Sequence, residues 1–476
     1  MTVELLAIAA YVAVQIVIGF VVSRRIRTEA DYLVAGRRLG PVMVAMSTFA
    51  TWFGAETCVS AAAASYEAGR LVPAAEPFGY GLAVALMGLL LAAPLWRRGI
   101  VTLADAYRDR FGVGVERFAA LLLVPGSTLW AAAQIRAFGG VLASASELTL
   151  PAAMTAAAIA VVLYTTVGGM LADAWHDLLQ GVLIIVGLFV LLGLVLSTEP
   201  SSVEASDARA APASVGHAHE AESLLATLDG WAIPILGSLV AQELVARVLS
   251  ARSAKVARNA TVSGGLLYVG IGVVPLLLGV LAARAGLVAE SSETVVADLA
   301  RHHLPTIAYA LFVGALVAAI LSTVDSSLLV AGSLLAHNVG PALFGPRDDA
   351  FRLRLARRVV LGLGVVAWGL AMGSESIADL VEQASAFGSA GVLVITLFGL
   401  FSRLGHAPSA IGALVAGAAG WLAFQYLVPL DAPYLGSVLA ALLVYVALSR
   451  LGRRAGRDRA TADLEAGGVG PAATHG

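Results

Sequence analysis

Charged residues are scarce in this 476-residue chain, and there is a single cysteine. Asp, Glu, Lys and Arg make up 13% of the sequence, whereas soluble domains carry roughly 25%. Hydrophobic residues make up 59%. A soluble protein of this composition would need a very large dry core, although chains of this size usually divide into domains. The lone Cys58 excludes an intramolecular disulfide and a CxxC-type site. An integral membrane protein is therefore predicted.

Long apolar stretches occupy most of the chain. A spanning helix needs about 20 mainly apolar residues. Thirteen spans are predicted, at 4–23, 41–66, 75–97, 114–146, 150–169, 176–197, 229–250, 262–285, 305–338, 356–373, 380–402, 407–428 and 433–450. The polar, acidic segment 198–228 is predicted to be an external loop, and 461–476 has the composition of a disordered cytoplasmic tail. The sequence thus predicts an all-α transporter domain over 1–460.

Basic residues are concentrated in alternate connections between the predicted spans. They follow odd-numbered spans and include Arg24, Arg25, Arg27, Arg97, Arg98, Arg252, Lys255, Arg357, Arg358, Arg453 and Arg454. The other connections contain few arginines. Because positive charge favours the cytoplasmic side, we predict an external N-terminus and a cytoplasmic C-terminus in the plasma or inner membrane.

Two predicted spans carry a glycine among polar residues in mid-membrane. They contain MSTFATWFGAETCVS (46–60), with Gly54, and ILGSLVAQELVAR (235–247), with Gly237. Carriers built from inverted repeats place unwound helices at corresponding positions of the two halves. The two spans lie five apart, and an odd offset gives the halves opposite topologies. We predict two repeats over about 41–197 and 229–402, with three spans outside them: 4–23, 407–428 and 433–450.

The segment AILSTVDSS (319–327) places hydroxyl and carboxylate groups within an apolar stretch. Ala319, Ser322 and Thr323 share one helical face, since they are spaced i, i+3 and i+4. One carbonyl and two hydroxyls form half of a site for a hard monovalent cation, and unwound backbone at 50–54 could supply the other half. The alternative is that the hydroxyls simply bond back to carbonyls of their own helix.

Several motifs together resemble the sodium/solute symporter family, whose members carry sugars, proline, sialic acid, iodide and vitamins on a LeuT-type fold. The motifs are DYLVAGRRLG (31–40), STFATWFGAET (47–57), TLADAYRDRFG (102–112), VGGMLADAWHDLLQG (167–181), RVLSARSAKVAR (247–258) and LSTVDSSLL (321–329). The thirteen spans, the external N-terminus and the broken second and seventh spans agree with this resemblance. It implies a fold of two inverted repeats of five spans each.

The resemblance also implies a Na⁺ site. Its ligands would be the backbone carbonyls of Ala50, Phe53 and Ala319 together with the hydroxyls of Ser322 and Thr323.

Other acidic residues match positions linked to the ion in relatives. Asp177 matches a residue on the ion route, with His176 in place of the usual Thr or Ser. Alternatively, Asp177 caps the first turn of its helix. Asp325 and Ser326 could form a second ion site or pair with a polar neighbour.

Substrate contacts are expected between the two broken spans and the fourth span. The candidates are Gly54, Glu56, Thr57, Trp130, Gln134, Arg136, Gln242 and Glu243. Arg136 could receive a substrate carboxylate bidentately, or it could pair with Glu56, Glu243 or Asp325. Arg247 is expected to pair locally with Glu243, four residues earlier.

These features predict a Na⁺-coupled symporter that imports a sugar, an amino acid or a carboxylate by alternating access. Its partners would be the solute and the lipid bilayer, without nucleic acid or an obligatory protein. One alternative is proton coupling through Glu56 or Asp325, and another is a membrane ligand sensor. An enzyme is not expected, because His176, His217 and His219 do not cluster with acids at one depth.

Overall fold

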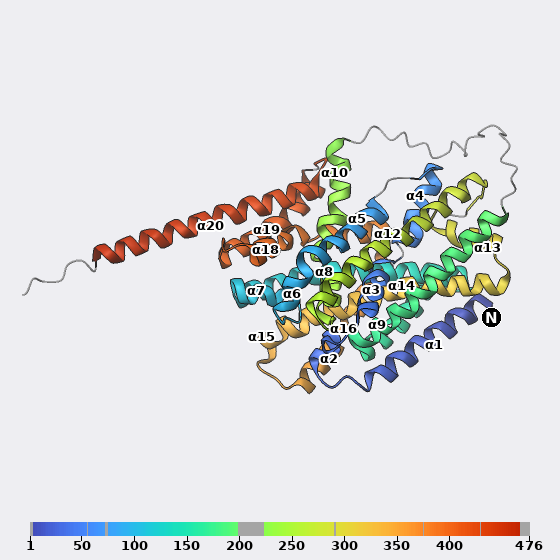
Figure 1. The fold of residues 1–476 in the computed structure, drawn as a ribbon, viewed down its shortest axis with the longest axis horizontal. Helices are drawn as coiled ribbons and strands as arrows, with labels where there is room; N and C mark the ends of the chain where they lie inside the picture. Colours follow the sequence, from blue (N-terminus) through green and yellow to red (C-terminus); the bar gives the residue numbers. More distant parts are fainter. Residues whose placement is uncertain are drawn as a thin grey trace, which may run out of the picture.

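The computed structural model describes residues 3–54, 56–71, 75–198, 223–289, 292–374, 376–428 and 430–466. Helices of several lengths dominate these residues (Figure 1). Most of the predicted loop 198–228 lies outside the described residues, as do the last ten residues of the predicted tail.

The described residues of the first half of the chain form nine α-helices and three short 3₁₀ or π segments. In order they are α1 (Val3–Ser23), α2 (Glu29–Val34), η1 (Ala35–Arg37), α3 (Pro41–Trp52), η2 (Glu56–Ser60), α4 (Ala61–Ala68), α5 (Ala75–Leu86), η3 (Met87–Ala92), α6 (Ala93–Arg97), α7 (Leu103–Phe111), α8 (Val113–Ser144) and α9 (Leu150–Thr198).

The second half continues the helical pattern. Its elements are α10 (Leu224–Ala232), η4 (Ile233–Gly237), η5 (Ser238–Val240), α11 (Gln242–Ser250), α12 (Ala254–Arg284), η6 (Ser292–Thr294), α13 (Val295–His303), α14 (Thr306–Ser333), η7 (Leu334–Val339), α15 (Gly340–Phe344), α16 (Asp349–Gly373), α17 (Ile377–Ala386), α18 (Ser389–Phe401), α19 (Ala407–Leu422), η8 (Ala423–Leu427) and α20 (Pro433–Ala466).

Both predicted breaks are present. The helix pair Pro41–Trp52 and Thr57–Ala68 is bent by 63°, and the pair Leu224–Val240 and Gln242–Ser250 by 41°. Counting each bent pair as one span, the described residues contain up to twelve candidate spans.

The prediction of thirteen spans differs from this count at α9. The sequence predicts two spans where the structure has a single 49-residue element. A straight helix of that length would extend about 74 Å, more than twice the roughly 30 Å of hydrocarbon in a bilayer. The backbone leaves helical geometry at Gly169, with φ 58° and ψ −175°. Divided at Gly169, α9 accounts for both predicted spans.

Other boundaries also differ from prediction. The short helices α2, α7 and α13 were not predicted, because each is too short to give a long apolar signal. The predicted span 380–402 is interrupted between α17 and α18, where Gly388 is left-handed with φ 75°. α20 continues to Ala466 and so includes the first six residues of the predicted tail; Ala, Leu and Glu among them are strong helix formers.

The long helices pack in two groups. α12 packs against α3, α4 and α5, and α11 adjoins α3 and α12. α14 packs against α8 and α9, and α16 contacts the same two helices. α3 touches both α14 and α9, so it lies where the two groups meet (Figure 1). A site between α3 and α14 would therefore sense any movement of one group against the other.

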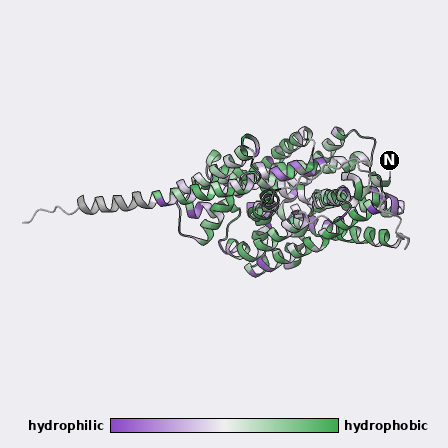
Figure 2. Ribbon diagram, turned by 90° about the horizontal axis from the view of Figure 1, so that it is seen from above, coloured by the Kyte–Doolittle hydropathy of each residue, from purple (hydrophilic) through white to green (hydrophobic). Residues whose placement is uncertain are grey.

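The outer helices present apolar residues to their surroundings. Hydrophobic colours predominate along the helices in Figure 2. Only 22% of the apolar window in α20 is buried, against 78% in the span that contains α14. Exposed Val17 and Phe20 on α1 are examples of side chains that a bilayer would cover. α14 is thus the central helix, and polar residues on it require partners within the protein.

A buried ionic cluster fastens short helices to the end of the central span. Glu29 of α2 lies 3.2 Å from His337 and 3.3 Å from Arg352. His337 also lies 3.4 Å from Asp105 of α7. Burial raises the pKa of the Glu29 carboxyl, but His337 and Arg352 outweigh burial and lower this pKa below its ordinary value. Glu29 therefore stays ionised and holds α2 against η7.

Gly169→Ala tests the turn in α9. A Cβ at Gly169 would lie 2.6 Å from Tyr32 Cδ2 and 2.8 Å from its carbonyl oxygen, and the backbone angles are essentially confined to glycine. We expect a loss of roughly 1–3 kcal/mol in stability, measured as a lower thermal midpoint in detergent. Gly193→Ala is the matched control, because its Cβ would meet nothing within 4 Å in the same helix. Equal midpoints for the two variants would contradict the proposed turn.

Candidate functional site

The two predicted halves of the cation site are in contact. Thr323 Oγ1 on α14 donates a hydrogen bond of 2.9 Å to the carbonyl oxygen of Thr51 on α3. Thr51 lies between Ala50 and Phe53, at the point where α3 ends and the chain bends. Ala319, Ser322 and Thr323 are all buried. The structure therefore brings the hydroxyl face of α14 to the carbonyls of the broken span.

Asp177 joins this contact from a third helix. Its Oδ1 accepts a 2.5 Å hydrogen bond from the Ser322 hydroxyl, and its Oδ2 accepts one from Ser47 of α3. The alternative that Asp177 caps a helix start is wrong, because α9 runs through this position and Asp177 lies well inside it. The carboxylate is fully buried beside the predicted ion ligands.

Arg247 supplies a buried positive charge beside Asp177. Its Nη2 lies 2.5 Å from Asp173 Oδ2 and 3.2 Å from Asp177 Oδ2, and it also donates to the Ser326 hydroxyl. The predicted pair with the Glu243 carboxylate is wrong: only the backbone oxygen of Glu243 accepts from Arg247, at 3.5 Å. Two carboxylates on α9 compensate the guanidinium more fully than one local partner.

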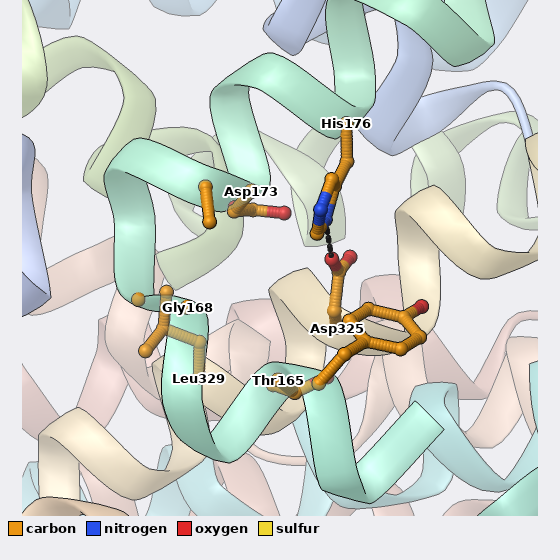
Figure 3. A pocket seen from close by; sticks show the side chains of 9 residues that line it. Thr165, Gly168, Asp173, His176, Asp325 and Leu329 are labelled. Atoms are coloured by element: carbon orange, nitrogen blue, oxygen red, sulfur yellow. Dashed lines mark hydrogen bonds and ion pairs between the residues drawn. The ribbon is translucent and has the colours of Figure 1, made fainter. Parts of the chain in front are cut away.

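Asp325 faces His176 across the interior (Figure 3). Its Oδ2 lies 3.1 Å from His176 Nδ1, and His176 Nε2 lies 3.1 Å from the carbonyl oxygen of Gln15 on α1. Figure 3 also shows Asp173 directed toward this pair from α9. His176 thus gives Asp325 a polar neighbour, which was one of its two predicted outcomes.

A second region of interest is a cavity between α8, the break before α11 and the break after α17. We call it the central cavity. It is lined by Leu123, Gly126, Ser127, Trp130, Gly237, Ser238, Val240, Ala241, Gln242, Glu243, Ala384, Ser385, Phe387 and Ser389. Three predicted substrate contacts, Trp130, Gln242 and Glu243, are among them. The cavity therefore combines an apolar wall with one buried carboxylate.

Aromatic rings extend the wall of the central cavity. The Trp130 ring lies 5.7 Å from that of Trp52 and 6.1 Å from that of Tyr80, measured between centroids. Among the described residues, Trp130 Nε1 and Ser238 Oγ are buried without a hydrogen-bond partner. A buried polar atom in this position is available to a bound molecule.

The comparisons with known proteins agree on the family. The family model described as "Sodium:solute symporter family" matches residues 32–420. The chain belongs to the sodium:solute symporter family. The structure and the family match confirm the expectation of an all-α membrane transporter, and membership of this family implies the use of Na⁺.

Curated relatives of this symporter carry different solutes. The high-affinity choline transporter 1 of Caenorhabditis elegans is 27% identical over 384 residues, covering 75% of this chain and 66% of that protein. The Torpedo marmorata protein of the same name is 28% identical, covering 74% and 63%. The sodium/proline symporter of Haemophilus influenzae is 26% identical, covering 90% and 89%. The symporter thus spans less than two thirds of the length of these choline transporters.

Solved structures confirm the fold. A Na⁺-coupled sialic acid symporter in a substrate-bound, outward-open state aligns with a TM-score of 0.78 at 16% identity, covering 95% of this chain and 98% of that one. The nucleobase-cation-symport-1 family transporter Mhp1 in a closed conformation aligns with a TM-score of 0.54 at 15% identity, covering 88% and 94%. The symporter therefore has the LeuT-type fold.

The other predicted substrate contacts are not among the residues that line the central cavity. The Thr57 hydroxyl lies 2.5 Å from the Glu76 carboxylate and 2.5 Å from the Tyr268 hydroxyl. Gly54 and Gln134 are buried, and the Glu56 side chain lies outside the described residues. These positions give no direct support to a role in binding the solute.

Arg136 and Gln242 both have structural partners. Arg136 Nη1 donates a 2.6 Å hydrogen bond to the Ser374 carbonyl between α16 and α17, and Arg136 is not among the residues that line the central cavity. Asp325, one of its predicted partners, contacts His176 instead. Gln242 Oε1 accepts from the Leu103 amide at 2.8 Å while the residue also lines the cavity.

Sequence reasoning missed the cavity wall at 385–389 and the Asp173–Arg247 pair. The first had a visible signal, because Gly388 stands among Gln383 and Ser385 in an apolar stretch, as Gly54 and Gly237 stand among polar residues. The second had none: 74 positions separate Asp173 from Arg247, and periodicity reveals only neighbours along one helix.

Proposed function

We propose that the chain is a Na⁺-coupled symporter for a small organic cation of the choline type. The observation that carries the sodium half of this proposal is the contact between the hydroxyl face of α14, the end of α3 and Asp177. The solute half rests on the aromatic and acidic lining of the central cavity and on the choline transporters among the relatives.

Sodium would bind among the carbonyls of Ala50, Phe53 and Ala319 and the hydroxyls of Ser322 and Thr323. Each hydroxyl already donates its proton elsewhere, Ser322 to Asp177 and Thr323 to the Thr51 carbonyl. Its oxygen lone pairs are therefore free to accept a cation. Oxygen ligands suit a hard ion, and the buried Asp177 carboxylate adds the negative charge that favours a monovalent cation.

The lining of the central cavity suits a quaternary ammonium group. Aromatic faces attract cations through their quadrupoles, and Trp is the strongest of them. Trp130 provides such a face, and buried Glu243 provides a countercharge. The partnerless Trp130 Nε1 and Ser238 Oγ could bond to a solute hydroxyl. The Glu243 carboxylate would repel an anionic solute, which disfavours the expected carboxylate substrate.

Alternating access follows from the division of the helices into two groups. Na⁺ between α3 and α14 would join the groups and stabilise the arrangement that receives the solute. Release of Na⁺ would loosen this junction and let the group containing α3, α11 and α12 move against α8, α9 and α14. The membrane potential contributes about 2.3 kcal/mol per charge per 100 mV and drives both cations inward.

Ser322→Ala with Thr323→Ala tests the sodium site. Two lost oxygen ligands at about 1.5 kcal/mol each would lower Na⁺ affinity roughly a hundredfold. The measurement is the Na⁺ dependence of [³H]choline uptake into proteoliposomes. Ser333→Ala is the control, because Ser333 lies on the same helix and its hydroxyl only bonds back to Leu329. Uptake that needed no Na⁺ and followed a pH gradient would contradict the proposal and favour proton coupling.

Trp130 tests the solute class. We expect choline to compete with [³H]choline uptake while proline and glucose do not. Trp130→Leu removes a desolvated cation–π contact of about 2 kcal/mol and should raise the KM for choline roughly thirtyfold, whereas Trp130→Phe keeps an aromatic face and should change it much less. Na⁺-driven uptake of proline without uptake of choline would contradict a choline-type substrate and indicate an amino acid.

A further inference from the structure

The guanidinium of Arg247 lies in a polar nest that would otherwise suit a second cation. Its Nη2 contacts Asp173 Oδ2 and Asp177 Oδ2 of α9 and the Ser326 hydroxyl of α14. Two carboxylate oxygens and a hydroxyl oxygen are ligands that hard cations prefer. The side chain of Arg247 is fully buried.

This nest adjoins the proposed sodium site through shared groups. Asp177 accepts from Ser322 through Oδ1 and from Arg247 through Oδ2. The Ser326 hydroxyl lies one helical turn beyond Ser322, and its oxygen is 2.7 Å from the Ser322 carbonyl oxygen and 2.9 Å from Asp173 Oδ1, either of which can accept its proton. The two positions therefore occupy successive turns of α14 and have one carboxylate in common.

The charges around Asp177 favour an added cation. Asp173, Asp177 and Asp325 are carboxylates, while Arg247 is the permanent cation and His176 faces Asp325. Arginine stays protonated in proteins, so its charge is always present. With one guanidinium in place, an excess of negative charge remains beside Ser322. A second mobile ion at Ser326 would have to displace Arg247 from two carboxylates.

We propose that Arg247 permanently fills the second cation position and thereby limits the symporter to one Na⁺ per solute. This inference rests on the sodium site proposed above. The guanidinium is tethered to α11, whose first turn carries Gln242 and Glu243 of the central cavity. Arg247 therefore sets the number of ions and also connects Asp177 to the helix that lines the cavity.

The experiment counts Na⁺ bound by the full-length carrier purified in detergent. Na⁺ titrations, followed by tryptophan fluorescence and by thermal shift with N-methylglucamine chloride as the ionic-strength substitute, give a Hill coefficient. We expect a coefficient of one for the unaltered protein. Arg247→Gln vacates the nest and should raise it toward two. Arg247→Lys retains a cation there and should leave it near one.

A transport measurement gives an independent count. In proteoliposomes, the voltage that halts net [³H]choline movement at a fixed Na⁺ gradient gives the charge carried per choline. We expect two charges for the unaltered protein, one from Na⁺ and one from choline, and three for Arg247→Gln. If Arg247→Gln fails to fold, Arg247→Gln with Asp173→Asn restores the local charge balance and should again bind one Na⁺.

The outcomes separate this inference from the proposed function. Two Na⁺ bound by the unaltered protein would overturn the inference and leave sodium coupling intact. A folded Arg247→Gln protein that still bound one Na⁺ and carried two charges per choline would also overturn it, because Arg247 would then be only a structural partner of Asp173. No Na⁺ binding by the unaltered protein would overturn the proposed function itself.

Discussion

The buried carboxylate of Asp177 connects four helices, and the account of transport depends on it. It lies on α9 and accepts hydrogen bonds from Ser47 on α3, Ser322 on α14 and Arg247 on α11. A carboxylate in the membrane interior is stable only when such partners compensate its charge. Because the donors come from both packing groups, the relative position of the groups and the charge state around Asp177 depend on each other.

This arrangement connects the proposed ion site to the central cavity through a short series of contacts. Na⁺ at Ser322 and Thr323 would add positive charge beside Asp177 and weaken the interaction between the Asp177 carboxylate and Arg247. Arg247 belongs to α11, which brings Glu243 into the cavity wall. A cation in the cavity would in turn interact with the Glu243 carboxylate, which lies one helical turn from Arg247. Coupling between ion and solute would then arise from a shared set of carboxylates and cations. Through this set, binding of each ligand would change the affinity of the protein for the other.

The family, the helical fold and both breaks could be predicted from sequence because each has a local signature. Span length follows from bilayer thickness, and Gly54 and Gly237 stand out among apolar neighbours. The contact between α14 and the end of α3 was also expected from the spacing of Ser322 and Thr323. Their roles as ion ligands remain proposals.

Contacts between helices that are far apart in the sequence could not be predicted. Arg247 has Glu243 at an i−4 position, so local reasoning paired these two, but tertiary packing places Asp173 and Asp177 closer to the guanidinium. Arg136 donates to the Ser374 carbonyl between α16 and α17, a contact that the sequence did not indicate. The short helices α2, α7 and α13 were not predicted, because each is too short to give a long apolar signal.

The most direct test of the account measures the linkage between Na⁺ and choline when Asp177 is neutralised. Isothermal titration of the purified carrier would give the Kd for Na⁺ with and without saturating choline. In the unaltered protein, choline should tighten Na⁺ binding by a factor within the roughly 5–150-fold range usual for coupled sites. In Asp177→Asn that factor should fall to about one while choline still binds. If Asp177→Asn kept the full linkage, the shared carboxylate could not be what couples the ion to the solute.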